Sequence, residues 1–214
     1  MDFGTDQEQL RKEDKLTQED SVLRQDILPL VNSITGKAVD GERILVTIDG
    51  PCASGKTTLA QVLADVMNCD VIHTDDFVVP HRQKTPERLA VPGGNCDWER
   101  LLREVIGPWK SGSEVRYQKY DCHEDRLTSP EPIRSDKLLI LEGCYCNLPE
   151  IREYADVRIF LETPEEERFE RLSRRETPEA LMRFQNLWIP LENAYFEAYG
   201  LPDPGCIVWT MKNE

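Results

Sequence analysis

The chain has 214 residues, which is enough for one substantial domain with its own core and too few for a second domain of similar size. Its net charge of −14 disfavours a nucleic-acid partner, because binding to a phosphate backbone depends mainly on Lys and Arg. It has no apolar run of about eighteen residues, and its charged start lacks the apolar centre of a signal peptide. The composition therefore predicts a soluble, cytoplasmic protein with no membrane partner.

The seven cysteines are odd in number and scattered along the chain. This pattern favours free thiols in a reducing compartment over a disulfide framework. Cys144 and Cys146 are one residue apart, but two ligands on one short segment do not complete a tetrahedral metal site. We therefore expect small buried or loop thiols.

Residues 1–17 are almost entirely polar, and we expect them to be disordered or to form a solvated helix. Residues 18–214 are predicted to form a single domain. Thr17 opens a sequence similar to a helix capping box, and apolar residues follow at helical spacing. Pro29 is expected to kink that helix and Gly36 to end it.

A glycine loop follows the apolar run Ile44–Ile48, and a helix with apolar residues at i, i+3, i+4 and i+7 from Leu59 follows the loop. The loop fits the pattern G-x-x-x-x-G-K-[ST], whose backbone N–H groups cradle phosphates. In this pattern the Lys reaches the β- and γ-phosphates and the Thr meets Mg²⁺. The residues expected to bind the nucleotide are Gly50, Ala53, Ser54, Gly55, Lys56, Thr57 and Thr58.

A second short strand, Asp70–Thr74, is followed by Asp75 and Asp76. Acidic residues at the carboxyl end of a strand lie where open α/β sheets bind their ligands. One of the two is predicted to be a general base or a Mg²⁺ ligand, and a solvated turn is the alternative.

Residues 80–97 are rich in Pro and Gly and predict a long functional loop, the start of an acceptor-side insertion that covers 80–136. Asp97 is expected to cap a helix that ends near Gly107 and Pro108, or to contact the substrate. An irregular hairpin should follow between Tyr117 and Pro132.

Lys137–Gly143 has the uninterrupted Leu and Ile character of a central parallel strand that is buried on both faces. Glu142 lies at its carboxyl end. A carboxylate is expensive to bury there unless it serves a cation, so Glu142 is predicted to serve Mg²⁺, directly or through water.

A further strand, Asp156–Leu161, leads into a helix that carries Arg168, Arg171 and Arg175. Their one-sided spacing near a phosphate site suggests that residues 164–178 form a lid that stabilises phosphoryl charge. The alternative is a solvated face paired with glutamates at i,i+4. After it, residues 178–199 should be helical, with the side chains of Trp188, Pro190, Tyr195 and Phe196 in the core.

Cys206–Trp209 is the last of five predicted strands, which alternate with helices. This pattern predicts an α/β fold with a five-stranded parallel sheet covered on both faces. The sequence contains neither the N-K-x-D and D-x-x-G signatures of GTPase switches nor the LSGGQ signature of transporter ATPases. A kinase requires a phosphate cradle, a Lys, Mg²⁺, a base and arginines on a mobile cover, and each has a candidate here.

From Ile44 to Phe196 the chain resembles the uridine kinase group of P-loop kinases, which is related to phosphoribulokinase and pantothenate kinase. The resemblance lies in Gly50–Thr58, Thr74–Phe77, Tyr120 to Arg126, Leu141–Gly143, Arg168 to Glu176 and Trp188 to Tyr195. It implies a P-loop nucleoside-triphosphate hydrolase fold that uses ATP and Mg²⁺. It also implies that Asp75 is the catalytic base and a Mg²⁺ partner, with Thr57 and Glu142 completing the metal environment.

By the same resemblance, Tyr120, His123 and Arg126 face a nucleoside, and Arg168, Arg171 and Arg175 cover the ATP phosphates. The segment Tyr120–Arg126 is one residue shorter than the family pattern, and Pro92–Trp98 replaces the stretch that holds the ribose. The hypothesis is therefore Mg²⁺-ATP-dependent phosphorylation of a hydroxyl on a uridine-like nucleoside. Another small acceptor, such as a sugar or a pantothenate-like compound, and a non-catalytic nucleotide-binding regulator are the alternatives. The sequence leaves open the use of GTP, the choice between Asp75 and Asp76, and the oligomeric state, a homo-oligomer included.

Overall fold

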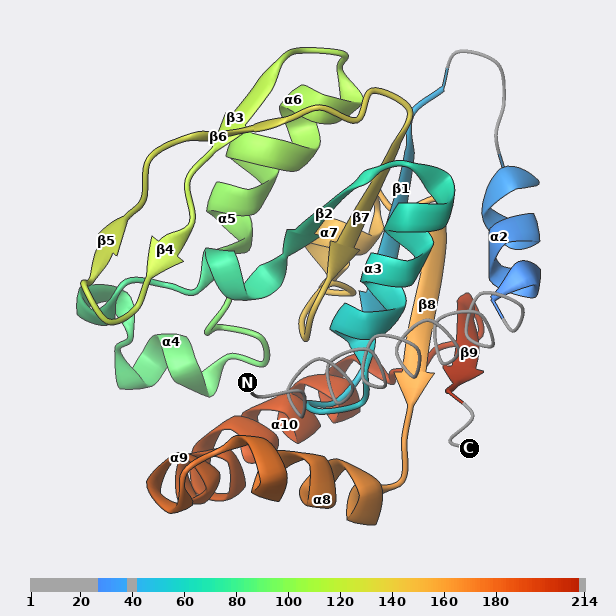
Figure 1. The fold of residues 1–214 in the computed structure, drawn as a ribbon. Coiled ribbons are helices and arrows are strands. Elements are labelled where there is room, and N and C mark those ends of the chain that lie inside the picture. Colours follow the sequence, from blue (N-terminus) through green and yellow to red (C-terminus); the bar gives the residue numbers. More distant parts are fainter. Residues whose placement is uncertain (1–26, 38–41, 212–214) are drawn as a thin grey trace, which may run out of the picture.

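The computed structural model describes residues 27–37 and 42–211. A five-stranded parallel sheet with strand order β2-β7-β1-β8-β9 forms its centre (Figure 1). The strands are β1 Ile44–Asp49, β2 Asp70–His73, β7 Leu138–Glu142, β8 Val157–Glu162 and β9 Cys206–Thr210. The five strands predicted from the sequence are all present, and the α/β P-loop fold is confirmed.

The strand that precedes the glycine loop, β1, lies in the middle of the sheet and is buried along its whole length. In the register of the sheet, Glu142 of β7 is opposite Ile48 of β1 on one side and His73 of β2 on the other. The carboxyl ends of these parallel strands therefore meet at one edge, directly beside the glycine loop.

Apolar side chains alternate between the two faces of the sheet, as the period of a strand requires. Leu45, Leu139 and Leu141 lie in one apolar cluster, and Val46 and Ile140 lie in the other. Helices cover both faces. The first cluster includes residues of α5 Trp98–Leu101, η3 Leu102–Ile106, α6 Gly107–Lys110, α7 Pro149–Arg152 and α10 Ile189–Tyr199, and the second includes residues of α2 Leu28–Thr35 and α3 Lys56–Met67. In α3, the expected apolar face is buried except for Val66, which is 43% exposed.

Pro29 lies in the first turn of α2, which begins at Leu28, and the preceding part of the helix that Pro29 was expected to kink lies outside the described residues. A proline is tolerated there because the first N–H groups of a helix have no intrahelical partner. Gly36 ends α2, as predicted. The polar segment 1–17 and the capping sequence at Thr17 lie outside the described residues.

The helix that begins after Asp97 does not end near Gly107 and Pro108 but continues to Lys110. Its middle part, η3, is a π-helix in which the N–H of Gly107 donates to the carbonyl of Leu102. A Cβ on Gly107 would lie 3.0 Å from that carbonyl, so a glycine suits the wide turn. Pro108 then lies in the first turn of α6, where its missing N–H costs little.

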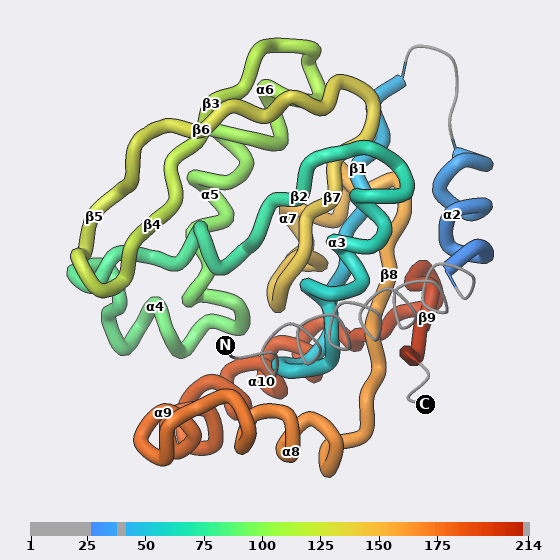
Figure 2. The backbone as a smooth tube through the Cα atoms, in the orientation of Figure 1, coloured from blue at the N-terminus to red at the C-terminus, as the bar shows by residue number. Residues whose placement is uncertain are grey.

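Residues 80–136, which the sequence predicts to be an acceptor-side insertion, lie on one flank of the sheet (Figure 2). The segment 80–97, expected to be a long loop, contains the short helices η2 His81–Gln83 and α4 Pro86–Ala90. The expected hairpin is confirmed as two antiparallel pairs. These are β3 Val115–Tyr117 with β6 Glu131–Ile133, and β4 Tyr120–Asp121 with β5 Arg126–Leu127.

The arginine-bearing helix, α8 Glu165–Arg175, follows β8 at the end of the sheet to which that strand points (Figure 1). It is followed by α9 Pro178–Arg183, the π-helix η4 Phe184–Trp188 and α10. Of the four residues expected in the core, Tyr195 is fully buried, and Trp188 and Phe196 are partly buried. Pro190 is exposed, because it lies in the first turn of α10 on the side away from the core.

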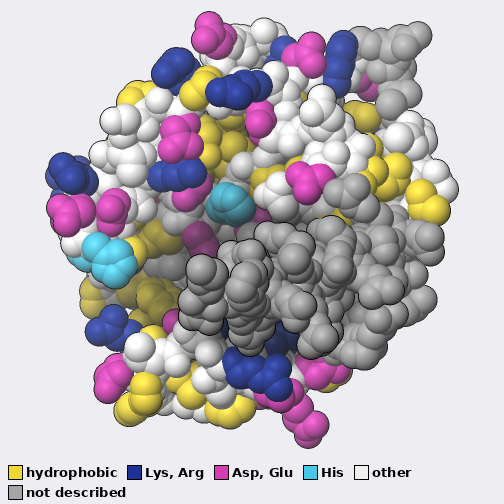
Figure 3. All heavy atoms as spheres, in the orientation of Figure 1, with side chains coloured by type: hydrophobic (Ala, Val, Ile, Leu, Met, Phe, Trp, Pro, Cys, Tyr) yellow, Lys and Arg dark blue, Asp and Glu magenta, His cyan; other side chains and the backbone are white. Residues whose placement is uncertain are grey.

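All seven cysteines are free thiols. Within residues 27–37 and 42–211, no helix combines the length and the apolar character that a bilayer crossing requires. On the face drawn in Figure 3, acidic and basic side chains are interspersed and do not form one continuous basic surface.

Candidate active site

The glycine loop joins β1 to α3 through three residues with positive φ, Gly50 at 142°, Ala53 at 58° and Gly55 at 99°. A Cβ on Gly50 would lie 2.4 Å from the carbonyl oxygen of Leu161, so only glycine fits between the loop and β8. Helix α3 then begins at Lys56 and directs the free N–H groups of its first turn at the mouth of the loop. This is the geometry of an anion-binding loop.

Lys56 is 9% exposed, and its Nζ donates to the carbonyls of Gly50 (2.8 Å) and Pro51 (2.9 Å) across the loop. Arg171 of α8 donates to the carbonyl of Ala53 at 3.1 Å, and Arg168 to that of Cys52 at 3.5 Å. The arginines expected from the sequence are thus on a helix that contacts the phosphate loop.

A cavity of about 300 Å³ lies over this loop. It brings together most of the residues predicted to bind the nucleotide, and Met211 was not among those predicted. The lining residues are Ala53, Gly55, Lys56, Thr57, Thr58, Arg171, Arg175 and Met211. Gly50 and Ser54 lie outside this lining: Gly50 shapes the loop, and the hydroxyl of Ser54 is buried with no hydrogen-bond partner among the described residues.

Glu142 contacts side chains of two neighbouring elements, α3 and β2, at the carboxyl edge of the sheet. Its Oε1 accepts a hydrogen bond from the hydroxyl of Thr57 at 3.0 Å and lies 2.5 Å from Nδ1 of His73. The side chain is only 6% exposed. The hydrogen bond to Glu142 raises the pKa of His73 above its usual value.

Asp75 and Asp76 lie in the short helix η1 Thr74–Phe77, directly after β2. Asp75 is exposed to solvent. Neighbouring protein still removes part of the water around its carboxyl, and this desolvation raises the pKa of that group. Lys56 and Arg175 oppose that rise in pKa, so Asp75 lies within electrostatic range of the phosphate loop and of α8. Asp76 has one carboxylate oxygen buried without a hydrogen-bond partner among the described residues.

The oxygen set of Thr57, Glu142 and Asp75 fits Mg²⁺, a hard cation that kinases hold with one or two carboxylates and the phosphates of the substrate. The carboxylate of Glu142, buried beside the Thr57 hydroxyl, is the observation that supports this fit. In the described ranges, no group of three or more His, Cys, Asp or Glu side chains forms a metal site, so Mg²⁺ bound here would also need the Thr57 hydroxyl and the phosphates of the substrate as ligands.

A second cavity, of about 350 Å³, lies in the acceptor-side insertion. Three of the four residues predicted to contact the substrate, Asp97, Tyr120 and Arg126, line it. His123 does not: it is exposed on the β4–β5 turn, where its backbone N–H donates to Asp121. Asp97 is placed for both of its predicted roles, helix cap and substrate contact. Its carboxylate caps α5 by accepting from the N–H of Arg100 at 3.1 Å, and the residue lines this cavity.

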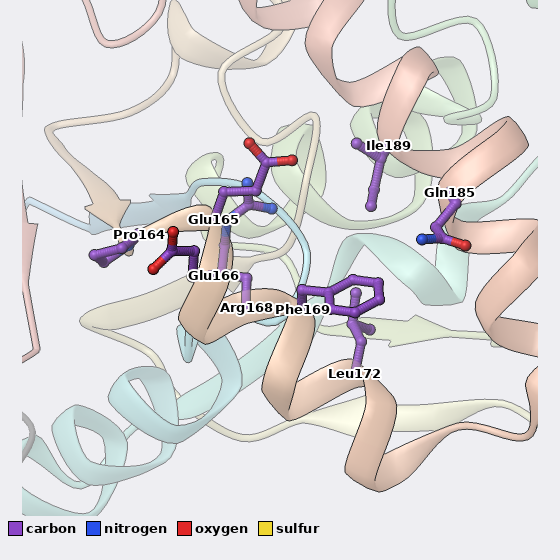
Figure 4. A pocket seen from close by; sticks show the side chains of 8 residues that line it. All are labelled: Pro164, Glu165, Glu166, Arg168, Phe169, Leu172, Gln185 and Ile189. Carbon is purple, nitrogen blue, oxygen red and sulfur yellow. The ribbon is translucent and has the colours of Figure 1, made fainter.

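A third cavity, of about 700 Å³, separates α8 from η4 and α10 (Figure 4). The ring of Phe169 and the side chains of Leu172 and Ile189 give it apolar walls, and Gln185 lies opposite α8. Arg168 also lines it. Because Arg168 contacts Cys52, this cavity adjoins the phosphate loop.

Two groups of polar contacts were not predicted. His73 was left unassigned, although its place at the end of a strand next to that of Glu142 was a usable signal. Glu192 and Tyr195 of α10 bind the base of the glycine loop, at Cys52 and Asp49. Their spacing of three residues puts them on one helix face, but nothing in the sequence indicates which element that face meets.

The model of a family described as an AAA domain matches residues 46–199. A uridine kinase from Ureaplasma parvum is 32% identical over 134 residues, which are 58% of this chain and 64% of that protein. The chain thus spans less than two thirds of the length of the curated relatives that it matches first.

Two solved structures have a similar fold. One, described as a possible uridine kinase from Bacillus stearothermophilus, has a TM-score of 0.64 and 22% identity, with 91% of this chain and 99% of that chain covered. The other, a D-glycerate 3-kinase from Cryptococcus neoformans, has a TM-score of 0.63 and 13% identity, with 90% and 94% covered. At these identities the likeness is one of fold.

Proposed function

The chain belongs to the AAA-domain family of P-loop proteins, and on that premise we propose that it is a Mg²⁺-ATP-dependent kinase of small hydroxyl compounds, with a uridine-like nucleoside as acceptor. The observation that carries the proposal is the contact of the glycine loop, β7 and β2 beside Asp75: Oε1 of Glu142 accepts from the hydroxyl of Thr57 at 3.0 Å and lies 2.5 Å from Nδ1 of His73, two residues before Asp75. Burial raises the pKa of the Asp75 carboxyl, and the charges of Lys56, Glu142 and Arg175 also act on it. Three separate segments thus meet around one candidate base.

In the proposed reaction, an acceptor oxygen forms a bond to the γ-phosphorus while the bond from that phosphorus to the bridging oxygen breaks, and ADP leaves. Asp75 takes the proton of the acceptor hydroxyl. Lys56 and the arginines of α8 neutralise charge on the phosphates. Bound Mg²⁺ would add charge neutralisation between the phosphates, held by Thr57, Glu142 and Asp75.

Asp75 is a better candidate for the base than Asp76. Burial and the nearby charge of Asp76 raise the pKa of Tyr117, and the backbone carbonyl of Asp76 accepts from Arg100 at 2.6 Å. These contacts direct Asp76 to the insertion, whereas Asp75 is the residue under the influence of the phosphate loop.

One observation favours a second acceptor class. His123, which the family resemblance assigns to the nucleoside, lies outside the lining of the acceptor-side cavity. A non-nucleoside acceptor, such as a sugar or a hydroxy acid, needs no base-binding histidine. D-Glycerate 3-kinase shares this fold and, by its name, phosphorylates an acceptor of that kind.

The test is direct detection of phosphorylated product and ADP with Mg²⁺-ATP and a panel of nucleosides, sugars, sugar alcohols and hydroxy acids. We expect a nucleoside, uridine first, to give both products in equal amounts. ATP turnover that no nucleoside stimulates would refute the nucleoside assignment. Turnover with a sugar or hydroxy acid alone would support the second class, and ATP binding without any transfer would support the regulator.

A further inference from the structure

Helix α10 contacts the base of the phosphate loop with two buried side chains that are one helical turn apart. Oε2 of Glu192 accepts a hydrogen bond from the backbone N–H of Cys52 at 2.9 Å. The hydroxyl of Tyr195 donates to Oδ2 of Asp49 at 2.7 Å. Asp49 in turn accepts from the N–H of Gly50 at 2.7 Å. Two of the first N–H groups of the loop are therefore directed at protein carboxylates.

Glu192 is an unusual residue for this position. The residue is only 7% exposed, and burial raises the pKa of its carboxyl. Burying a carboxylate costs several kcal/mol, roughly, unless hydrogen bonds or charges compensate for the lost water. A carboxylate beside a loop that binds phosphate also repels the ligand. The hydrogen bond from the N–H of Cys52 and the positive charges of Lys56 and Arg168 compensate for this burial in part, and the hydrogen bond also fixes the direction of the Cys52 peptide.

The same peptide segment is held from its other side by the lid. The carbonyl of Cys52 accepts from Arg168 at 3.5 Å, and that of Ala53 accepts from Arg171 at 3.1 Å. Helix α10 follows α8 in the chain through α9 and η4. One continuous stretch, 165–199, thus contacts both the N–H side and the carbonyl side of the loop.

We propose that Glu192 is a positioning residue for the phosphate loop: through its hydrogen bond to the N–H of Cys52, it keeps the loop in the conformation that binds nucleotide and in register with the lid arginines. The inference rests on the proposed function, in which the loop binds Mg²⁺-ATP. Glu192 acts through the backbone and does not touch the reacting atoms.

The test compares Glu192→Ala and Glu192→Gln with the wild type, and uses Glu197→Ala as a matched control because Glu197 is exposed on the same helix. The measurement is the Kd of Mg²⁺-ADP by calorimetry, with thermal unfolding in parallel. Glu192→Ala leaves a buried N–H without a partner, and we expect it to raise Kd by roughly 5- to 150-fold. Glu192→Gln retains an oxygen that accepts the bond, and Kd should stay within about threefold of the wild-type value.

Three outcomes overturn the proposal. Glu192→Ala could lower the unfolding temperature and leave Kd unchanged, which would mean a structural role only. Glu192→Gln could bind as weakly as Glu192→Ala, which would mean that charge and not the hydrogen bond matters. Glu197→Ala could raise Kd to the same extent, which would mean a general effect of the helix. A wild-type protein that binds no Mg²⁺-ADP would instead refute the proposed function, so the two failures are distinguishable.

Discussion

Replacing Asp75 by Asn tests the assignment of the catalytic base. The change removes one negative charge and the ability to accept a proton, and it leaves the size of the side chain almost the same. Asp75 does not line the nucleotide cavity, and Asn keeps a side-chain oxygen that could still serve Mg²⁺, so ATP binding should persist. The loss should therefore appear in phosphoryl transfer and not in nucleotide affinity.

The size of the effect follows from the role. A positioned general base contributes roughly 100- to 10,000-fold to a rate, so kcat should fall by that factor, which corresponds to about 3 to 5 kcal/mol in the barrier. The affinity for ATP should change by less than about threefold. The carboxylate of Asp75 repels Glu142 as well as the ATP phosphates, and its removal also removes that repulsion.

The assay is the rate of ADP formation with the acceptor identified by the panel, together with Mg²⁺-ATP affinity by calorimetry. Asp76→Asn is the matched control, because it makes the same chemical change one residue later, on the side of Tyr117. A variant at Asp75 that keeps more than about a tenth of the wild-type kcat would refute the base assignment. A large loss at Asp76 alone would transfer the role to that residue.

Lys56→Ala should raise the Kd of ATP roughly 10- to 100-fold by calorimetry, since a charged donor to the phosphates is lost, and an unchanged Kd would contradict its role. Gly143→Ala would put a Cβ 2.0 Å from Oγ1 of Thr74 at a φ of +128°, so urea unfolding should show a larger loss of stability than in Gly200→Ala, where φ is also positive and the space is open. The pKa of Asp49 rises from 3.8 to about 6 through burial, so the folded state binds its proton more tightly than the unfolded state. This contribution to stability is complete below pH 3.8 and is lost as the pH rises through about 6, a decrease of about 3 kcal/mol that should be missing from the pH profile of Asp49→Asn. Parallel pH profiles for the two proteins would disprove it.

The sheet was predictable because its strands carry strong local signals. The runs that became β1 and β7 are mainly Ile, Leu and Val, which is typical of strands buried on both faces. The glycine loop has a fixed spacing between strand and helix, and Glu142 is expensive to bury at a strand end. Each signal depends on residues that are close together in sequence.

The features that were missed depend on tertiary contacts. Gly107 and Pro108 normally end a helix, but a π turn allows the chain to continue through them. Pro190 was grouped with aromatic core residues although the face on which it lies is exposed. The contact of Glu192 with Cys52 joins residues that are far apart in sequence, and no periodicity indicates it.

The central position of β1 has a consequence for how this protein folds. Ile44 pairs with Leu138, and Val46 pairs with Val157, so both neighbours of the loop-bearing strand come from much later in the chain. Non-local parallel pairing makes folding slow, because chain closure must precede the gain from contact. During synthesis, β1 would emerge long before its partners, with an apolar surface on both faces that only later strands and helices can cover.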